Sequence, residues 1–264
     1  MLEARALDYG YRGRPIGRDL NLSIANAEAV CVLGPNGAGK TSLFKTLLGL
    51  LPPLGGEVLL DGRDVSALSQ REIARKLAYV PQAHASFFPF TAADIVLMGR
   101  AARVGLTDAP REVDRAAAHA ALTKLRIAHL ASVPYTRISG GERQLVLIAR
   151  ALAQDPRCLI MDEPTANLDL ANQTRVLEVI ADLTAEGLSV LFSTHDPDHA
   201  FACAACVALM REGAIVAVGA PDDVINAAAL RSLYDIDVDV LQISVDGRKM
   251  CAPVLRKRGR RDGP

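Results

Sequence analysis

The sequence predicts an α/β domain with a largely parallel sheet, into which a helical lobe is inserted. Short apolar runs of strand length alternate with stretches of helical periodicity, which is typical of βαβ units. From about Ser86 to Pro134 this alternation stops, and apolar residues recur at helical spacing. At 264 residues and 50% hydrophobic content, the chain is long enough to bury a sizeable core.

The first part of the chain contains strand candidates that end at turn-forming residues. One of them runs into a glycine-rich loop that opens a helix, and Pro81 ends another. In the lobe, Thr91 is a plausible helix cap and an alanine-rich segment predicts a longer helix. The expected elements are strands Glu28–Leu33, Glu57–Asp61 and Leu77–Val80, and helices Lys40–Leu51 and Arg111–Leu125.

The α/β alternation resumes after the lobe, which we place at about residues 86–150. Two apolar runs predict buried strands, and a hairpin is expected around Arg211, Glu212 and Gly213. The expected elements are helix Gly141–Gln154, strand Cys158–Met161, helix Ala171–Ala185, strand Leu188–Ser193 and the hairpin strands Val207–Met210 and Ala214–Val218.

The composition argues against several classes of protein. Thirty acidic and thirty basic side chains cancel, tryptophan is absent, and aromatic residues make up only 4%. Such a chain has neither the basic surface nor the stacking platforms that nucleic acids require. No uncharged apolar run reaches 18 residues, and the N-terminus lacks a signal-peptide layout. We therefore expect no membrane span, and a protein that stays in the cytoplasm.

The five cysteines give no convincing metal site. Cys203 and Cys206, preceded by His199, resemble half of such a site, but no second pair exists. We interpret the segment as a helix in which these residues pack against neighbours.

A glycine-rich segment matches the phosphate-binding P-loop pattern G-x-x-x-x-G-K-[ST]. Its glycines let backbone N–H groups approach phosphate oxygens, and the helix that follows adds its positive end. The lysine can reach the terminal phosphates and the threonine can bind Mg²⁺. The segment is Gly34, Pro35, Asn36, Gly37, Ala38, Gly39, Lys40 and Thr41.

Polar side chains follow three of the predicted strands. Asp162 and Glu163 end the strand Cys158–Met161, His195 follows the next buried strand, and Gln82 follows Pro81. Ligands in parallel α/β sheets gather at the carboxyl ends of strands. There Asp162 could hold Mg²⁺, and Glu163 could orient and deprotonate an attacking water.

The segment Ser139, Gly140, Gly141, Glu142 has two readings. Ser139 and Glu142 have the spacing of a capping box. Two glycines in a first helical turn cost roughly 1 kcal/mol each relative to alanine, however. They make sense where backbone N–H groups must lie against an anion, so a phosphate group could be clamped from two sides.

These residues together resemble the ATP-binding subunit of an ABC transporter. Walker A is GPNGAGKT (residues 34–41), the Q-loop is Gln82, the signature is ISGGERQ (residues 138–144), and Walker B is CLIMDE (residues 158–163). The D-loop is ANLD (residues 166–169) and the switch histidine is His195. Ile138, Glu142 and Ala166-Asn167 depart mildly from the commonest residues at their positions.

The resemblance implies a P-loop NTPase (RecA-like) core with an N-terminal antiparallel β-subdomain and an inserted α-helical subdomain. It covers residues 1–235, followed by a short extension (residues 236–254) and a disordered basic tail (residues 255–264) with five cationic side chains. The tail could also attract anionic lipid weakly.

The resemblance also implies a head-to-tail homodimer with two ATP sites. Mg²⁺ would be held by Thr41, Gln82 and Asp162, and Glu163 would be the catalytic base, assisted by His195, Lys40 and Gln82. Residues 34–41 and Ser42 would contact ATP in one subunit, and Ser139, Gly140, Gly141 and Glu142 would contact it from the other. Asp169 would communicate between the sites. Either Tyr11, which matches the family's aromatic position, or Tyr9 would stack on adenine.

A finer resemblance is to type II importers of iron–siderophore complexes, haem or cobalamin. It rests on Val80–Gln82, Phe88–Thr91 and Val96–Arg100, while Leu170–Gln173 is closer to molybdate relatives. The expected partners are a membrane permease dimer and a separate substrate-binding protein, with no nucleic acid, at the cytoplasmic face of the inner membrane. The alternatives are an exporter ATPase, a soluble ABC protein acting on nucleic acid, and a P-loop kinase, which the signature segment disfavours.

Overall fold

The computed structural model describes residues 1–82, 90–104, 108–243 and 249–254. The first part of the importer-like segment Phe88–Thr91 and the basic tail lie outside these residues. Within them, the central sheet has six strands in the order β10-β9-β3-β8-β7-β6. Their bounds are β3 Ala29–Leu33, β6 Leu77–Val80, β7 Cys158–Met161, β8 Ser189–Thr194, β9 Cys206–Arg211 and β10 Ala214–Gly219.

The pairing confirms the predicted, largely parallel α/β sheet. β3 runs parallel to β8 and β9, and β7 runs parallel to β6 and β8. Only β10 is antiparallel, and it forms the expected hairpin with β9. Glu212 and Gly213 both have positive φ, the conformation that a tight turn with the twist of the flanking strands requires.

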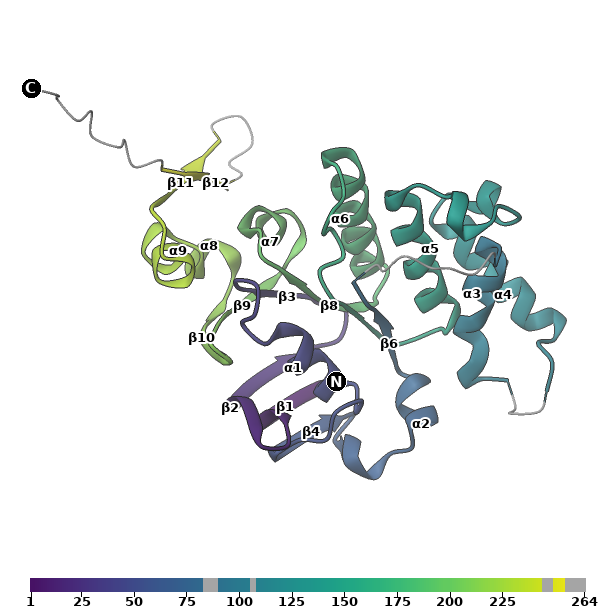
Figure 1. Cartoon of the computed structure of the whole chain (residues 1–264), viewed down its shortest axis with the longest axis horizontal. Coiled ribbons are helices and arrows are strands. Elements are labelled where there is room, and N and C mark those ends of the chain that lie inside the picture. Colours follow the sequence, from purple (N-terminus) through teal and green to yellow (C-terminus); the bar gives the residue numbers. More distant parts are fainter. Residues whose placement is uncertain (83–89, 105–107, 244–248, 255–264) are drawn as a thin grey trace, which may run out of the picture.

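The described residues of the N-terminal part form a second, antiparallel sheet in the order β2-β1-β4-β5 (Figure 1). This is the antiparallel β-subdomain that the resemblance implied. Its strands are β1 Leu2–Tyr11, β2 Arg14–Ile24, β4 Gly55–Leu60 and β5 Arg63–Asp64, and a separate hairpin pairs β11 Val238–Gln242 with β12 Lys249–Pro253.

Helices cover the central sheet on both faces (Figure 1). The inserted lobe contains α3, α4 and the start of α5, which pack against one another beside the end of the sheet. The helices are α1 Lys40–Leu47, α2 Gln70–Ala74, α3 Ala92–Leu97, α4 Glu112–Lys124, α5 Gly140–Ala153, α6 Leu170–Ala185, α7 Pro197–Cys203, α8 Pro221–Val224 and α9 Ala227–Tyr234, with 3-10 turns at Val65–Ala67, Met98–Ala102, Ala128–Leu130 and Tyr135–Arg137.

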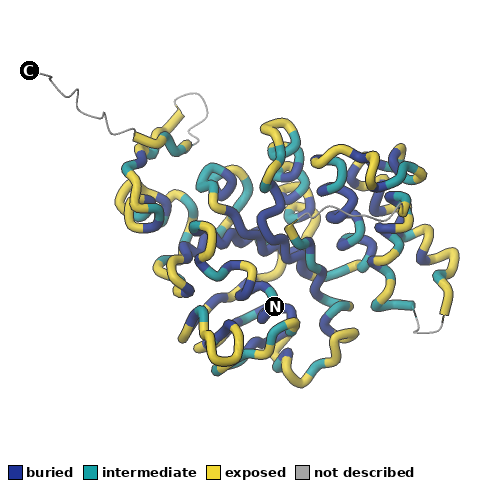
Figure 2. Tube along the Cα trace, in the orientation of Figure 1, coloured by how far each residue is buried: buried dark blue, intermediate teal, exposed yellow. Residues whose placement is uncertain are grey.

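Two hydrophobic cores lie on the two faces of the central sheet, and the strand residues divide between them by alternation. Val30 and Val32 of β3 pack with α1 and the N-terminal sheet. Cys31 and Leu33 pack with α6, α7 and the lobe helices. Because both faces are covered, every residue of β3 is buried, and the deepest segments in Figure 2 are the central strands.

Most predicted boundaries agree with the structure to within one or two residues, with one clear exception. Helix α1 ends at Leu47, although the sequence predicted a helix to Leu51. The N–H of Leu48 still bonds to the carbonyl of Phe44 at 3.0 Å, but Gly49 then adopts φ +65°. A left-handed glycine just after a helix is a common terminator, and it stops the helix early.

The expectation that Cys203 and Cys206 share a helix is wrong. α7 ends at Cys203, Ala204 is extended, and Cys206 begins β9. The N–H of Ala205 already bonds to the carbonyl of Ala29 at 2.9 Å, so sheet pairing with β3 overrides helix continuation. Among the described residues, no group of three or more His, Cys, Asp or Glu side chains is arranged to hold a metal ion.

None of the helices in the described part of the chain is both long and apolar enough to cross a bilayer.

Candidate functional site

The glycine-rich loop joins β3 to α1 at the carboxyl edge of the central sheet. Gly39 caps α1 with φ +104°, a conformation that L side chains rarely adopt. A Cβ at this position would lie 2.7 Å from the Ile16 Cγ2 and 2.9 Å from the Tyr9 hydroxyl. Because the cap residue has no side chain, the first N–H groups of α1 stay available to an anion from outside.

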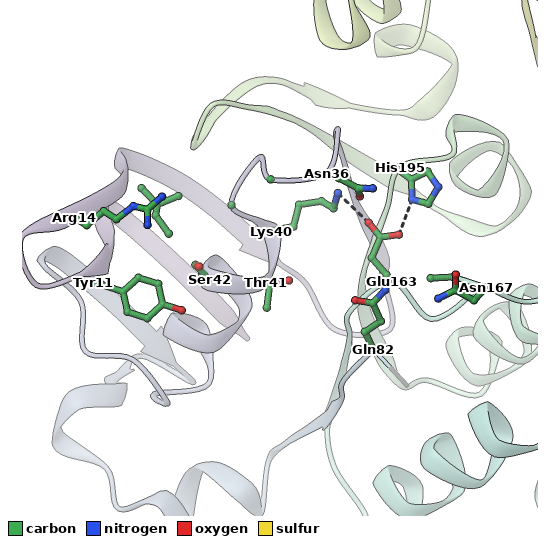
Figure 3. A pocket seen from close by; sticks show the side chains of 14 residues that line it. Tyr11, Arg14, Asn36, Lys40, Thr41, Ser42, Gln82, Glu163, Asn167 and His195 are labelled. Atoms are coloured by element: carbon green, nitrogen blue, oxygen red, sulfur yellow. Dashed lines mark hydrogen bonds and ion pairs between the residues drawn. The ribbon is translucent and has the colours of Figure 1, made fainter. Parts of the chain in front are cut away.

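Lys40 is the first residue of α1, and its side chain folds back over the loop. Nζ donates to the carbonyl of Gly34 at 2.7 Å and of Pro35 at 3.1 Å. It also lies 2.9 Å from Oε1 of Glu163, with both side chains nearly buried. The ammonium group is therefore held at the point where the loop meets the end of β7 (Figure 3).

Glu163 lies between two partners from different elements. His195, just after β8, places Nδ1 2.8 Å from Oε2 of Glu163, opposite Lys40 (Figure 3). The backbone of Glu163 has φ +48°, a strained value for a residue with a side chain. Its N–H donates to Ser193 Oγ at 2.9 Å, which fixes the unusual turn against β8.

Asp162 is not among the residues that line the cavity beside Glu163. It is 3% exposed and accepts hydrogen bonds from Ser193 Oγ at 2.8 Å and from the Tyr79 hydroxyl at 3.4 Å. Burial, with a smaller contribution from the charge of Asp162, raises the pKa of Tyr79 well above its usual value. The tyrosine therefore stays a donor, and Asp162 ties together the ends of β6, β7 and β8.

A cavity of about 800 Å³ brings most of the predicted residues together. Figure 3 shows Lys40, Gln82, Glu163 and His195 converging at one end, with Tyr11 and Arg14 at the other. The residues that line it are Tyr11, Arg14, Ile16, Asn36, Gly37, Gly39, Lys40, Thr41, Ser42, Gln82, Glu163, Ala166, Asn167 and His195. Gly34, Pro35 and Ala38 of the loop are not among the lining residues.

The structure separates the two tyrosine candidates. Tyr9 is fully buried and its hydroxyl donates to the carbonyl of Gly213 at 3.0 Å, while burial raises its pKa. Tyr11 is 47% exposed and lines the cavity. Tyr9 is therefore not available for stacking. Sequence reasoning missed Arg14, although its position opposite Tyr11 in the β1–β2 hairpin offered a signal.

The segment Ser139–Glu142 does not line this cavity. Ser139 caps α5 as predicted: its Oγ accepts the N–H of Glu142, and the Glu142 carboxylate accepts the N–H of Ser139 at 3.1 Å. The Ser139 hydroxyl also donates to this carboxylate at 2.7 Å, and this bond, together with the one from the Ser139 N–H, lowers the pKa of Glu142. Asp169 similarly caps α6 by accepting the N–H of Asn172 at 2.8 Å, and it also lies outside the cavity lining. Within one chain, these residues and the phosphate loop remain apart.

A buried histidine supports the cavity from behind and was not recognised as such in the sequence. His199 Nδ1 lies 3.0 Å from Thr194 Oγ1 and 3.2 Å from Thr165 Oγ1. Burial lowers its pKa, partly offset by Asp196. A neutral ring links Thr165, in the segment after β7, to Thr194 at the end of β8 without adding a charge.

Residues 18–166 match the family of ABC transporters. The chain belongs to this family. An uncharacterised ABC transporter ATP-binding protein of Haemophilus influenzae is 47% identical over 76% of each chain. The hemin import ATP-binding protein HmuV of Nocardia farcinica is 39% identical over 96% of this chain and 89% of its own.

A solved structure of similar fold supports the same assignment. It belongs to an ABC transporter described as of metal-chelate type, in an inward-facing conformation. The TM-score is 0.86, with 31% identity over 96% of this chain and 97% of the other. The chain is thus the ATP-binding subunit of an ABC transporter, an ATPase that works with membrane permease components and couples ATP hydrolysis to transport.

Proposed function

We propose that this chain powers the import of a metal chelate, with hemin, cobalamin or an iron–siderophore complex as the class of cargo. One observation carries the catalytic part: Lys40, Thr41, Gln82, Glu163 and His195 line a single cavity at the carboxyl edge of the sheet. The named functions of the Nocardia farcinica relative and of the metal-chelate transporter support the direction and cargo class.

In this proposal ATP lies along the cavity, with its phosphates at the phosphate loop and its adenine at the β1–β2 hairpin. Backbone N–H groups of the loop after Pro35 and the Lys40 ammonium hold the phosphates, and Tyr11 stacks on adenine. Glu163 takes a proton from the attacking water, and His195, 2.8 Å from Glu163, faces the γ-phosphate. Thr41, Gln82 and Asp162 would hold Mg²⁺, which prefers oxygen ligands. Thr41 and Gln82 line the cavity, and Asp162 directly precedes Glu163 in the chain. Bound Mg²⁺ would neutralise charge on the phosphates.

We further propose that two copies of the chain close head to tail over two ATP molecules. Ser139, Gly140, Gly141 and Glu142 of one copy would complete the cavity of the other, and Asp169 would signal between the sites. The capped start of α5 supports this, because a Cβ at Gly140 would meet nothing within 4 Å in its own chain. This open space at Gly140 leaves the first N–H groups of α5 accessible to a phosphate group bound in a second subunit.

The lobe offers a surface for the permease. A largely apolar groove of about 940 Å³ runs between α3 and α4, lined by residues that include Ala93, Leu97, Ala116 and Leu122. We propose that a permease segment docks there, which would place the ATPase at the cytoplasmic face of the inner membrane. A separate substrate-binding protein would deliver the cargo, and no nucleic acid would take part.

The decisive experiment measures uptake of labelled hemin, cobalamin, ferric siderophore and molybdate by cells. The cells carry as their only copy the wild type, Glu163→Gln, or the matched control Glu178→Gln on the exposed face of α6. We expect one cargo to stop entering only with Glu163→Gln. If uptake of all four is unchanged while the purified variant has lost ATPase activity, import of these cargos is refuted and export becomes the better reading.

A further inference from the structure

The last helix in the described part of the chain, α9, makes a direct hydrogen bond to the loop that carries His195. α9 ends at Tyr234, whose hydroxyl donates to the backbone carbonyl of His195 at 2.7 Å across 39 residues of sequence. Burial raises the pKa of this phenol, so it remains protonated and able to donate. The ring packs at the edge of the core shared by α6 and α7, so both ends of the side chain are held.

α9 is itself firmly anchored. Leu230 and Leu233 are buried, and the Arg211 guanidinium at the end of β9 donates to the carbonyl of Ser232. Arg231 forms an ion pair with Asp237 at 2.5 Å, just beyond the helix. These contacts hold α9 in place, and with it the position of the Tyr234 hydroxyl.

A second C-terminal element, β12, forms a hydrogen bond to the same loop three residues further along the chain. The N–H of Cys251 in β12 donates to Oδ1 of Asp198 at 2.8 Å. Asp198 in turn belongs to the first turn of α7, where its N–H bonds to the side chain of Asp196. The segment from His195 to Asp198 is thus held by two C-terminal elements, α9 and β12.

His195 needs this support because little else restrains it. Its side chain is 51% exposed, and among the described residues its polar side-chain contact is the one to Glu163. A catalytic group has to be held to within roughly 0.5 Å of its working geometry. Fixing the carbonyl of His195 restrains the direction of its Cα–Cβ bond, and this limits the positions from which the ring can reach Glu163.

We propose that Tyr234 is a positioning residue for His195, and that the two elements holding this loop, α9 and β12, set the rate of ATP hydrolysis through it. The proposal deepens the proposed function and rests on the role given there to His195 and Glu163. These two C-terminal elements would thereby be coupled to catalysis.

The test compares Tyr234→Phe with Ser232→Ala in the full-length purified chain. Tyr234→Phe removes the hydroxyl and keeps the packed ring, while Ser232→Ala removes a hydroxyl of the same helix whose partner is Arg211, at 3.4 Å, and leaves the stronger bond from Arg211 to the Ser232 carbonyl in place. We expect Tyr234→Phe to lower kcat for ATP about tenfold, equivalent to about 1.4 kcal/mol of transition-state stabilisation. The KM for ATP and the melting temperature should stay close to those of the wild type, and Ser232→Ala should behave as the wild type.

Hydrogen–deuterium exchange gives a readout that does not depend on turnover. Tyr234→Phe should speed exchange in the peptide containing residues 194–198, and Ser232→Ala should not. The proposal is overturned if exchange there is unchanged, or if kcat for Tyr234→Phe stays within twofold of the wild type. A wild-type chain that hydrolyses no ATP would instead contradict the proposed function, whatever the exchange data show.

Discussion

Lys40 and Glu163 form an ion pair shielded from solvent, with Nζ 2.9 Å from Oε1 and side chains only 5% and 10% exposed. In the proposed function the two groups have different roles: Lys40 binds phosphate and Glu163 activates water. The carboxylate therefore competes with the nucleotide for the ammonium group. ATP has to replace Glu163 as the partner of Lys40, and this exchange releases the base for catalysis.

The first prediction concerns the loss of that competition. Glu163→Gln removes the negative charge but keeps the shape, so Lys40 becomes free to bind phosphate. We expect ATP affinity to rise by up to about tenfold, or about 1.4 kcal/mol. Hydrolysis should fall by about 100-fold or more because the base is lost. Titration with a fluorescent ATP analogue and phosphate-release kinetics measure the two effects, with Glu178→Gln as control. Weaker binding by Glu163→Gln would contradict the competition.

The second prediction separates two neighbouring glycines at the start of α5. A Cβ at Gly140 meets nothing within 4 Å, so Gly140→Ala should leave the monomer intact and even stabilise the helix by up to about 1 kcal/mol. In the proposed dimer the added methyl group would crowd the phosphate of the other subunit. ATPase activity should therefore fall at least about tenfold, since small misplacements at a reacting group are costly. Urea denaturation and steady-state ATPase assays on the same preparation provide both values.

Gly141→Ala serves as the contrast. Its Cβ would lie 2.1 Å from the side chain of Asn172 in α6, so here the single chain already requires a glycine. We expect a loss of stability that Asn172→Ala partly restores. If Gly140→Ala hydrolyses ATP at the wild-type rate, the open helix start does not face a nucleotide.

The sequence predicted the phosphate loop and the strand-end residues because each depends on a local signal. A glycine-rich turn between a strand and a helix has few uses other than anion binding, and the carboxyl ends of parallel strands meet at one edge. Gln82, Glu163 and His195 follow β6, β7 and β8, which are neighbours in the sheet. Strand order was not needed to expect them close together.

Contacts that depend on tertiary structure left no such signal. Ser193 and Tyr79 bind Asp162 from neighbouring strands, and Tyr234 reaches His195 across 39 residues. Tyr9 and Tyr11 could not be separated either, since strand alternation places residues two apart on the same face. The pairing of β1 with β2 shifts register between Tyr9 and Gly10, which turns the two rings into different surroundings.

The third prediction uses this separation. Tyr11→Ala should weaken ATP binding roughly fivefold to 100-fold, because stacking on a base contributes about 1–3 kcal/mol. Tyr11→Phe keeps the ring and should bind ATP as the wild type does. Tyr9→Phe should instead lower the free energy of unfolding by about 1 kcal/mol, because the carbonyl of Gly213 loses its donor. Equal ATP affinity for Tyr11→Ala and the wild type would remove Tyr11 from the nucleotide site.

The fourth prediction concerns pH and the buried His199. Burial lowers its pKa in the folded chain, so below about pH 6.5, the usual histidine value, the unfolded chain binds a proton that the folded chain does not. Protonation then favours unfolding. The contribution of the neutral ring is complete above that pH and is lost as the pH falls, by up to about 1.4 kcal/mol per pH unit for one proton.

Urea denaturation at pH 7.5 and pH 5.5 measures this dependence. The wild type should lose more stability between the two values than His199→Gln, whose side chain cannot take up a proton in this range. His199→Gln should be less stable than the wild type at pH 7.5, because the ring that joins Thr165 and Thr194 is gone. The control His119→Gln, at an exposed position of α4, should show the same pH dependence of stability as the wild type. If His199→Gln loses as much stability between pH 7.5 and pH 5.5 as the wild type, a group other than His199 is responsible for the pH dependence. The neutral state of His199 would then not explain why the folded chain is less stable in acid.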